Sequence, residues 1–115
     1  MKKVLMINGS PNEFGCTYTA LSEVKSELAK NGVGSEIIYL GKKPIAGCIA
    51  CGECRKTGKC VFNDKVNELL PRLEAGEFGA MVLGSPVYFA GPSGQLCSFL
   101  ERLFYCRGTK LNGML

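Results

Sequence analysis

Short apolar segments typical of buried strands alternate along this chain with segments of helical periodicity. The strand-like segments are Lys3 to Asn8, Glu36 to Leu40 and Gly79 to Gly84, and the last of these is apolar throughout, as in a strand buried on both faces. Strands separated by helices run parallel and are joined by right-handed crossovers. The alternation therefore predicts an α/β domain with a parallel sheet.

The helical segments carry start and stop signals. The first runs from Thr17 to Lys30, and Asn31-Gly32 follows it as a helix stop. Asn63 or Asp64 can cap the second, in which Pro71 predicts a kink or a new start. The third runs from a Ser93 cap to about Tyr105. The residues expected on the inner faces are Leu21, Val24 and Leu28, then Val66, Leu69, Leu70 and Leu73, and finally Leu96, Phe99, Leu100, Leu103 and Phe104.

The segment C-I-A-C-G-E-C-R-K-T-G-K-C holds four of the seven cysteines: Cys48, Cys51, Cys54 and Cys60. A tight loop can aim four thiolates at one centre, as a cuboidal iron–sulfur cluster requires. Structural zinc usually draws on two separated Cys or Cys/His pairs, whereas this chain has no second pair and no histidine. The spacing favours a cluster over zinc. Reduced, unligated thiols in a glycine-containing loop are an equally weighted alternative.

Length and composition predict one soluble domain in a reducing cytoplasm. The chain has 115 residues, of which 46% are hydrophobic and 21% charged. The apolar run that starts at Val4 is too short for a signal peptide or a membrane span. Seven cysteines, an odd number, without an export signal indicate thiols kept reduced. The net charge of +4 is scattered, so nucleic-acid binding has little support.

The loop after the first strand has the composition of an anion-binding turn. Ligands of open α/β sheets bind beyond the carboxyl ends of the strands. There, Gly9 to Thr17 supplies the hydroxyls of Ser10 and Thr17, the amide of Asn12 and backbone N–H groups at a helix start. The loop has neither the P-loop pattern nor GxGxxG, which argues against a nucleoside triphosphatase. Taken alone, an ordinary capped turn explains it as well.

The loop after the third strand, Ser85 to Gly94, carries two prolines and two aromatic residues. Pro86 and Pro92 stiffen its backbone, while Tyr88 and Phe89 place flat apolar surface at the end of the strand. Such aromatics by default fill a core. Beside an anion-binding turn, however, they suit a flat ring carried on a phosphate tail, which is the shape of flavin mononucleotide (FMN).

Three segments of the chain resemble the flavodoxin-like NAD(P)H-dependent FMN reductases, and among them the iron–sulfur flavoproteins. The segments are N-G-S-P-N-E-F-G-C-T at 8–17, the cysteine motif at 48–60 followed by Asp64, and G-S-P-V-Y-F-A-G-P-S-G-Q-L at 84–96. The resemblance implies a flavodoxin-like, doubly wound parallel sheet. Residues 1–115 would form its N-terminal portion, three βα units of a five-stranded order, with a cysteine-rich loop at 44–60.

The same resemblance implies roles for individual residues. Family members often have Arg after the Ser-Pro and Asn before the Thr, whereas this chain has Asn12 and Cys16, which removes a positive charge. The implied FMN phosphate ligands are Ser10, Asn12, Cys16 and Thr17. The residues implied to lie along or near the isoalloxazine ring are Pro86, Val87, Tyr88, Phe89, Gly91 and Ser93. The implied ligands of a [4Fe-4S] cluster are Cys48, Cys51, Cys54 and Cys60.

The implied function is that of an FMN-dependent redox protein. It would be an NAD(P)H-dependent oxidoreductase, in which hydride passes from a nicotinamide to the flavin while the protein supplies binding and orientation. With a [4Fe-4S] cluster it would be an electron carrier. The expected partners are a small-molecule or protein redox partner and further copies of the chain in a homo-oligomer. The alternatives are a zinc- or cluster-stabilised binding module without enzymatic activity, and a flavin-free fragment.

Two further expectations concern the remaining cysteines and the third strand. Cys16, Cys97 and Cys106 are expected to stay outside the cluster ligand set, and the last two are expected to be buried as small hydrophobes. In the flavodoxin-like order 2-1-3-4-5 the third strand is interior. A chain that ends at Leu115 therefore predicts Ala80 to Leu83 as an apolar edge, covered by more of a longer natural chain or by a second chain.

Overall fold

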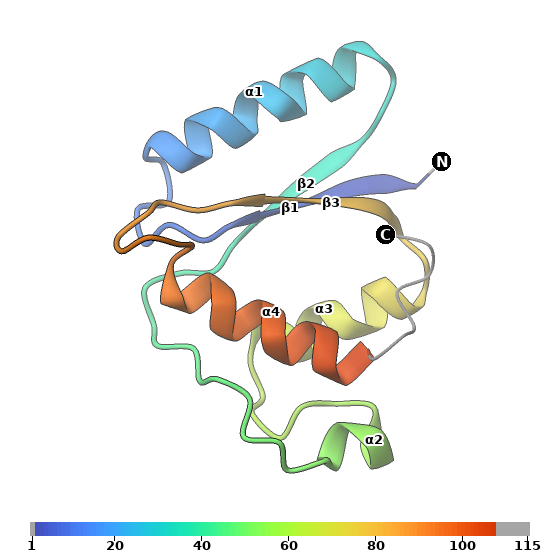
Figure 1. The fold of residues 1–115 in the computed structure, drawn as a ribbon. Helices are drawn as coiled ribbons and strands as arrows, with labels where there is room; N and C mark the ends of the chain where they lie inside the picture. Colours follow the sequence, from blue (N-terminus) through green and yellow to red (C-terminus); the bar gives the residue numbers. More distant parts are fainter. Residues whose placement is uncertain (1, 108–115) are drawn as a thin grey trace.

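The computed structural model describes residues 2–107, in which three parallel strands form one sheet between two layers of helices (Figure 1). The central strand is β1 (Lys3–Asn8), with β2 (Ser35–Tyr39) on one side and β3 (Phe78–Gly84) on the other. The order β2-β1-β3 corresponds to the first three strands of the flavodoxin-like order. The predicted α/β, flavodoxin-like parallel sheet is confirmed.

The register of the sheet brings three strand ends together. Asn8 at the end of β1 pairs with Tyr39 of β2 and with Gly84 of β3. The loops that leave these strands therefore start at the same edge of the sheet. The strand bounds differ from the prediction by one residue in β2 and at the start of β3, because pairing with β1 sets the limits of both strands.

Helices cover both faces of the sheet. The helix α1 (Cys16–Lys30) lies on one face, and α3 (Lys65–Glu74) and α4 (Gly94–Arg107) lie on the other (Figure 1). The predicted helix stop is confirmed, since Asn31 caps α1 and Gly32 follows with a φ of 75°. The inner face of α1 is narrower than predicted, because Leu21 is buried whereas the Val24 side chain is exposed.

The helix α3 begins at the predicted cap and continues through its proline. The Asp64 carboxylate accepts a hydrogen bond from the Val66 N–H over 3.1 Å. Pro71 lies inside a single helix, so the predicted new start is wrong. Leu70 and Leu73, on either side of the proline, are buried in the core, and this packing holds the last turn in place although one backbone donor is missing.

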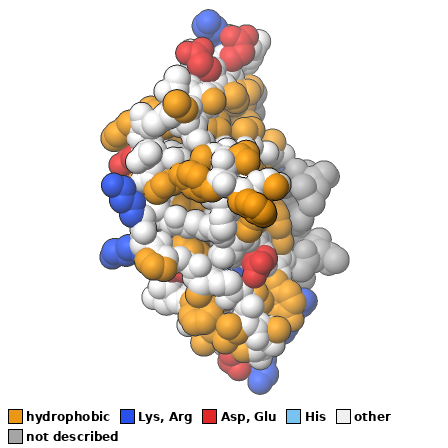
Figure 2. Space-filling view, turned by 60° about the vertical axis from the view of Figure 1, so that its left-hand side comes forward, with side chains coloured by type: hydrophobic (Ala, Val, Ile, Leu, Met, Phe, Trp, Pro, Cys, Tyr) orange, Lys and Arg blue, Asp and Glu red, His pale blue; other side chains and the backbone are white. Residues whose placement is uncertain are grey.

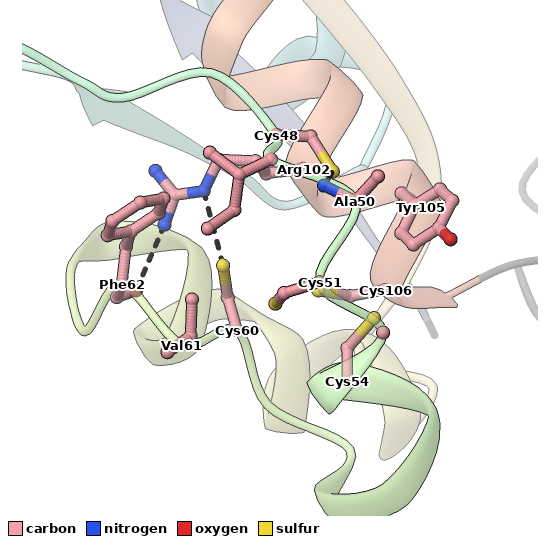
Figure 3. A pocket seen from close by; sticks show the side chains of 12 residues that line it. Cys48, Ala50, Cys51, Cys54, Cys60, Val61, Phe62, Arg102, Tyr105 and Cys106 are labelled. Carbon is pink, nitrogen blue, oxygen red and sulfur yellow. Dashed lines mark hydrogen bonds between the residues drawn. The ribbon is translucent and has the colours of Figure 1, made fainter.

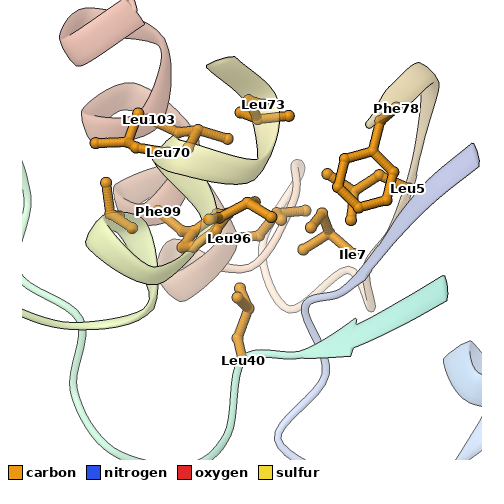
Figure 4. Packing of buried hydrophobic residues seen from close by; sticks show 11 residues of the cluster. Leu5, Ile7, Leu40, Leu70, Leu73, Phe78, Leu96, Phe99 and Leu103 are labelled. Atoms are coloured by element: carbon orange, nitrogen blue, oxygen red, sulfur yellow. The ribbon is translucent and has the colours of Figure 1, made fainter. Parts of the chain in front are cut away.

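The main hydrophobic core lies between the sheet and the layer of α3 and α4 (Figure 4). Leu5 and Ile7 alternate with Met6 along β1, so the first two side chains face this core and Met6 faces α1. In α4, Leu96, Phe99 and Leu103 are buried as predicted, whereas Leu100 and Phe104 are only half-buried. The core fixes α4 on the sheet and so places both ends of this helix.

The cysteine-rich segment contains a short helix that the sequence did not predict. It is α2 (Glu53–Thr57), which lies outside the layer of α3 and α4 (Figure 1). Glycines in the left-handed region bracket it, with φ of 79° at Gly52 and 76° at Gly58. The Gly58 N–H donates to the Cys54 carbonyl over 2.9 Å. A helix of five residues is too short to show a periodic apolar pattern.

The predicted apolar edge of the sheet is present in the described part of the chain. Within residues 2–107, β3 pairs only with β1. Its other edge and α1 border a groove of about 570 Å³, whose lining includes Val24 and Leu83. What covers this edge stays a prediction. No helix within the described range is long and apolar enough to cross a membrane.

An ion-pair network joins α3 to the ends of two strands. The Arg72 guanidinium donates from Nη1 to the Glu36 carboxylate over 2.8 Å and from Nε to the Glu77 carboxylate over 3.0 Å. The hydrogen bonds from Arg72 lower the pKa of Glu36 and of Glu77, and they raise the pKa of Arg72. The network therefore stabilises the fold while both carboxylates are ionised.

We predict that Arg72→Met lowers the free energy of unfolding at neutral pH, and that this decrease becomes smaller as the pH is lowered. Because the folded pKa values of Glu36 and Glu77 are lowered, their contribution is complete above an unfolded pKa of about 4.3 and is lost as the pH falls through the folded values. Urea unfolding followed from neutral pH down to about pH 3 measures the difference. Lys30→Met, in the exposed pair with Glu27, is the control and should change little. A decrease in the free energy of unfolding that is the same at every pH would contradict the prediction.

Candidate functional site

The loops that follow β1 and β3 are hydrogen-bonded to each other. The Gly9 N–H donates to the Gly84 carbonyl over 2.8 Å, and the Ser93 hydroxyl donates to the Gly9 carbonyl over 2.9 Å. Within the second loop, the Ser93 N–H donates to the Ser85 hydroxyl over 2.8 Å. The predicted anion-binding turn and the aromatic-bearing loop therefore lie side by side, at the carboxyl edge of the sheet (Figure 1, left).

A buried asparagine shapes the first loop. The Asn8 side chain is fully buried, where its Oδ1 accepts from the Ser10 N–H over 3.0 Å and its Nδ2 donates to the Glu13 carbonyl over 3.1 Å. The Ser10 hydroxyl, in turn, accepts from the Asn12 N–H over 3.1 Å. Asn8 was predicted as the end of a strand and as the first residue of the motif at 8–17, but no role was assigned to its side chain. Its place before G-S-P, a turn-forming sequence, was the available signal.

The start of α1 is open to an anion. Gly15 occupies the cap position and makes no side-chain hydrogen bond to the helix, and the first turn has no acidic residue. The first N–H groups of a helix have no partner within it, and the helix dipole makes this end positive. Cys16 is exposed and Thr17 is half-buried at this end of the helix, and their role as phosphate ligands stays a prediction.

The second loop presents its apolar side chains to solvent. Val87, Tyr88 and Phe89 are exposed, Phe89 to 91%, so the alternative that the aromatics fill the core is wrong. This loop faces the viewer in Figure 2, where hydrophobic side chains form a band across the middle of the surface. Ser93 is different, because its buried hydroxyl accepts from the Leu96 N–H over 3.2 Å and caps α4 as predicted.

The four clustered cysteines line one small pocket with the end of α4 (Figure 3). Cys54 is buried on α2, Cys48 and Cys60 are half-buried, and Cys51 is exposed. The Cys48 N–H donates to the Glu101 carboxylate over 2.9 Å, which fastens the start of the motif to α4. The structure therefore places the four predicted ligands around one pocket. The pocket lining also includes Arg102, Tyr105 and Cys106.

A cluster and a single metal ion would place different demands on these thiols. A single zinc ion holds its sulfur ligands about 2.3 Å from one point, whereas a cuboidal cluster binds one thiolate at each of four separate irons. Within residues 2–107, no three His, Cys, Asp or Glu side chains are grouped closely enough to hold a metal ion. The pocket that the four thiols line has a volume of about 20 Å³.

A buried arginine, which the sequence did not single out, crosses this pocket. Arg102 on α4 is 1% exposed and forms a bidentate ion pair with Asp64, with both contacts at 2.8 Å. Burial works to lower the pKa of Arg102, but the hydrogen bonds to Asp64 and Cys60 outweigh it and raise that pKa. Arg102 lies three residues after Phe99 and four before Cys106 on the inner stripe of α4, and this spacing was the signal that could have found it.

The two cysteines of α4, Cys97 and Cys106, differ in environment. Cys97 is exposed, so the expectation that it is buried is wrong, since its position on α4 faces away from the sheet. Cys106 is half-buried, packs against the core and lines the thiol pocket. Burial, followed by the neighbouring thiols of Cys54 and Cys60, raises the pKa of Cys106 to about 12. Its exclusion from the ligand set stays a prediction.

A parallel sheet in the order β2-β1-β3, with two hydrogen-bonded loops at its carboxyl edge, is the arrangement of a flavodoxin-like fold. Comparison with known families identifies which one. The chain belongs to the NADPH-dependent FMN reductase family, whose sequence profile matches residues 2–115. The resemblance predicted from the three motifs is confirmed.

Similar proteins are named iron–sulfur flavoproteins. One from Methanocaldococcus jannaschii is 39% identical over 100 residues, which are 87% of this chain and 51% of that protein. One from Archaeoglobus fulgidus is 34% identical over 101 residues, 88% of this chain and 45% of that protein. One from Clostridioides difficile is 30% identical over 112 residues, 89% of this chain and 49% of that protein. The chain thus spans about half the length of these relatives. No solved structure gives a significant match.

We predict that Gly84→Ala displaces α1 from the end of β3 and lowers the free energy of unfolding by about 1–3 kcal/mol. An added Cβ would lie 2.8 Å from Thr17 Cγ2 and 3.0 Å from Leu21 Cδ1, closer than packed carbon atoms allow. Gly94→Ala is the matched control, because a Cβ there meets nothing within 4 Å. Urea unfolding compares the two variants. Equal stability of the two would show that the contact between β3 and α1 tolerates a side chain.

Proposed function

We propose that this chain forms the FMN-binding part of a flavin-dependent redox protein. The observation that carries this proposal is the hydrogen-bonded junction of the two loops, through Gly9, Gly84 and Ser93, at the carboxyl edge of the sheet. One loop offers N–H groups for a phosphate, and the other offers flat apolar surface for a ring. Membership of the FMN reductase family supports the same ligand.

The residues present fit FMN. The N–H groups at the start of α1 would bind the phosphate, with the Thr17 and Ser10 hydroxyls and Asn12 beside them. Exposed Val87, Tyr88 and Phe89 would lie along the isoalloxazine ring. The hydrogen bonds around Asn8 and Ser93 hold both loops in place before the ligand arrives. When bound, FMN supplies the hydride and electron chemistry, and NAD(P)H is the donor we assign to it.

We further propose that Cys48, Cys51, Cys54 and Cys60 hold a [4Fe-4S] cluster. The four thiols line one pocket, and proteins similar in sequence to this chain are named iron–sulfur flavoproteins. A cluster exchanges single electrons, so a protein with both groups would be an electron carrier. The chain's own contribution is to hold the four sulfurs around one pocket beside α4, whose lining also includes Phe62 and Tyr105.

An absorbance spectrum of the protein purified without oxygen tests these assignments directly. We expect flavin bands together with a broad shoulder from the cluster. Flavin bands alone would indicate a cluster-free reductase and overturn the cluster assignment. A zinc-containing, colourless protein would indicate the binding module, and a colourless, metal-free protein the flavin-free fragment.

We predict that Thr17→Asp weakens FMN binding by roughly tenfold or more, about 1.4 kcal/mol. The new carboxylate at the start of α1 would repel the FMN phosphate. Ser26→Asp is the matched control, because it adds the same charge at an exposed position further along the same helix. Titration followed by quenching of flavin fluorescence gives the two dissociation constants, and thermal unfolding shows that both variants fold. Unchanged affinity in Thr17→Asp would mean that the phosphate binds elsewhere.

We predict that Cys54→Ser sharply lowers the iron and sulfide content of the anaerobically purified protein, whereas Cys97→Ser does not. Cys54 is buried in the thiol pocket, whereas Cys97 is exposed on the outer face of α4. Iron and acid-labile sulfide, measured per mole of protein, provide the comparison. Equal losses from both substitutions would remove the basis for the assigned ligand set.

A further inference from the structure

Arg102 places a desolvated positive charge against one of the candidate cluster ligands. Its Nε–H donates to the Cys60 sulfur over 3.3 Å, and the side chain is 1% exposed (Figure 3). The cations within the cysteine motif at 48–60 are instead exposed to solvent, which screens their charge. They are Arg55, which stacks over the Tyr105 ring at 4.8 Å, and Lys56 and Lys59.

Every N–H donor of this guanidinium has a partner. Nη1 donates to the Ala46 carbonyl over 3.1 Å and to Asp64 over 2.8 Å. Nη2 donates to the Phe62 carbonyl over 2.9 Å and to Asp64 over 2.8 Å. With Nε on the Cys60 sulfur, all five donors of the fork are used. Because the guanidinium group is planar, the ion pair with Asp64 also fixes the direction of Nε–H. That direction points at the Cys60 sulfur.

Cys60 is held from its other side as well. The Asn67 side chain accepts from the Cys60 N–H over 2.7 Å and donates to the Cys60 carbonyl over 2.9 Å. The backbone of Cys60 is thus fastened to α3 and its sulfur to α4. Among the four clustered cysteines, Cys60 is the one whose sulfur accepts from a charged side chain in the described structure.

We infer that Arg102 is a positioning residue that fixes Cys60 in the ligand set and, through the Nε–H···Sγ hydrogen bond, makes the bound cluster easier to reduce. The inference rests on the proposed [4Fe-4S] cluster. Reduction adds one electron to the cluster and increases the negative charge on its sulfur ligands. A hydrogen bond from a buried cation stabilises that charge, so it favours the reduced form and raises the reduction potential.

Asp64 has a defined part in this arrangement. It forms a bidentate ion pair with Arg102, and this pair orients the guanidinium so that Nε–H faces Cys60. Loss of Asp64 would leave the guanidinium of Arg102 buried and its charge unpaired. A single substitution can therefore unfold the protein without testing the hydrogen bond to sulfur.

The test compares Arg102→Lys, which keeps the charge, with the double variant Arg102→Met/Asp64→Asn, which removes both charges. Arg55→Met is the matched control, since it deletes an exposed cation of the same pocket region. Anaerobic redox titration, followed by the electron paramagnetic resonance signal of the reduced cluster, gives the potential. In the Arg102 variants we expect the reduced-to-oxidised ratio at a fixed potential to fall about tenfold, equal to about 59 mV for one electron. Arg55→Met should leave it nearly unchanged.

A second readout follows Cys60 without the cluster. Hydrogen–deuterium exchange of the metal-free protein should be faster around residues 58–64 in both Arg102 variants than in Arg55→Met. A parent protein that holds a cluster, but whose potential and exchange match those of the Arg102 variants, would overturn the inference and leave the proposed function intact. A parent protein that contains no iron after anaerobic purification would overturn the proposed cluster and, with it, the effect on its potential.

Discussion

The buried charge of Arg102 determines the course of the cysteine-rich segment, residues 46–64, over α4. A guanidinium with 1% exposure is tolerated only where its charge is paired and its N–H groups are bonded. Its partners, Ala46, Cys60, Phe62 and Asp64, come from both ends of the segment. If this segment lay away from α4, the guanidinium would lose its ion pair with Asp64 and the acceptors of its other N–H groups. The glycine-rich loop therefore gains a defined course from one side chain on a neighbouring helix.

The helix α4 connects the two proposed sites. At its start, Ser93 caps the helix and ties the aromatic loop to Gly9, and near its end Arg102 and Cys106 reach the thiol pocket. Arg102 lies nine positions after Ser93, which corresponds to roughly 14 Å at the helical rise. Because Phe99 and its neighbours anchor α4 in the core, the separation of the two sites is set by the same packing that stabilises the fold.

Local signals predicted much of this structure, and the exceptions depend on contacts between distant segments. The strands, the Asp64 and Ser93 caps and the stop at Asn31 follow from residues next to each other in the chain. Arg102 could not be recognised in this way, because its partners lie 38 to 56 residues away. The helix α2 is too short for periodicity, and the packing of Leu70 and Leu73 overrides the local effect of Pro71.

The two proposed sites obtain their positive charge from different sources. Asn12 stands where the family often has Arg, so the phosphate would depend on the N–H groups and dipole at the start of α1. This end of the helix is open to solvent, and its field is screened by salt. At the thiol pocket the charge belongs to a buried side chain that solvent does not reach. On the proposed function, ionic strength therefore acts mainly on flavin affinity, while the potential of the cluster stays under the control of Arg102.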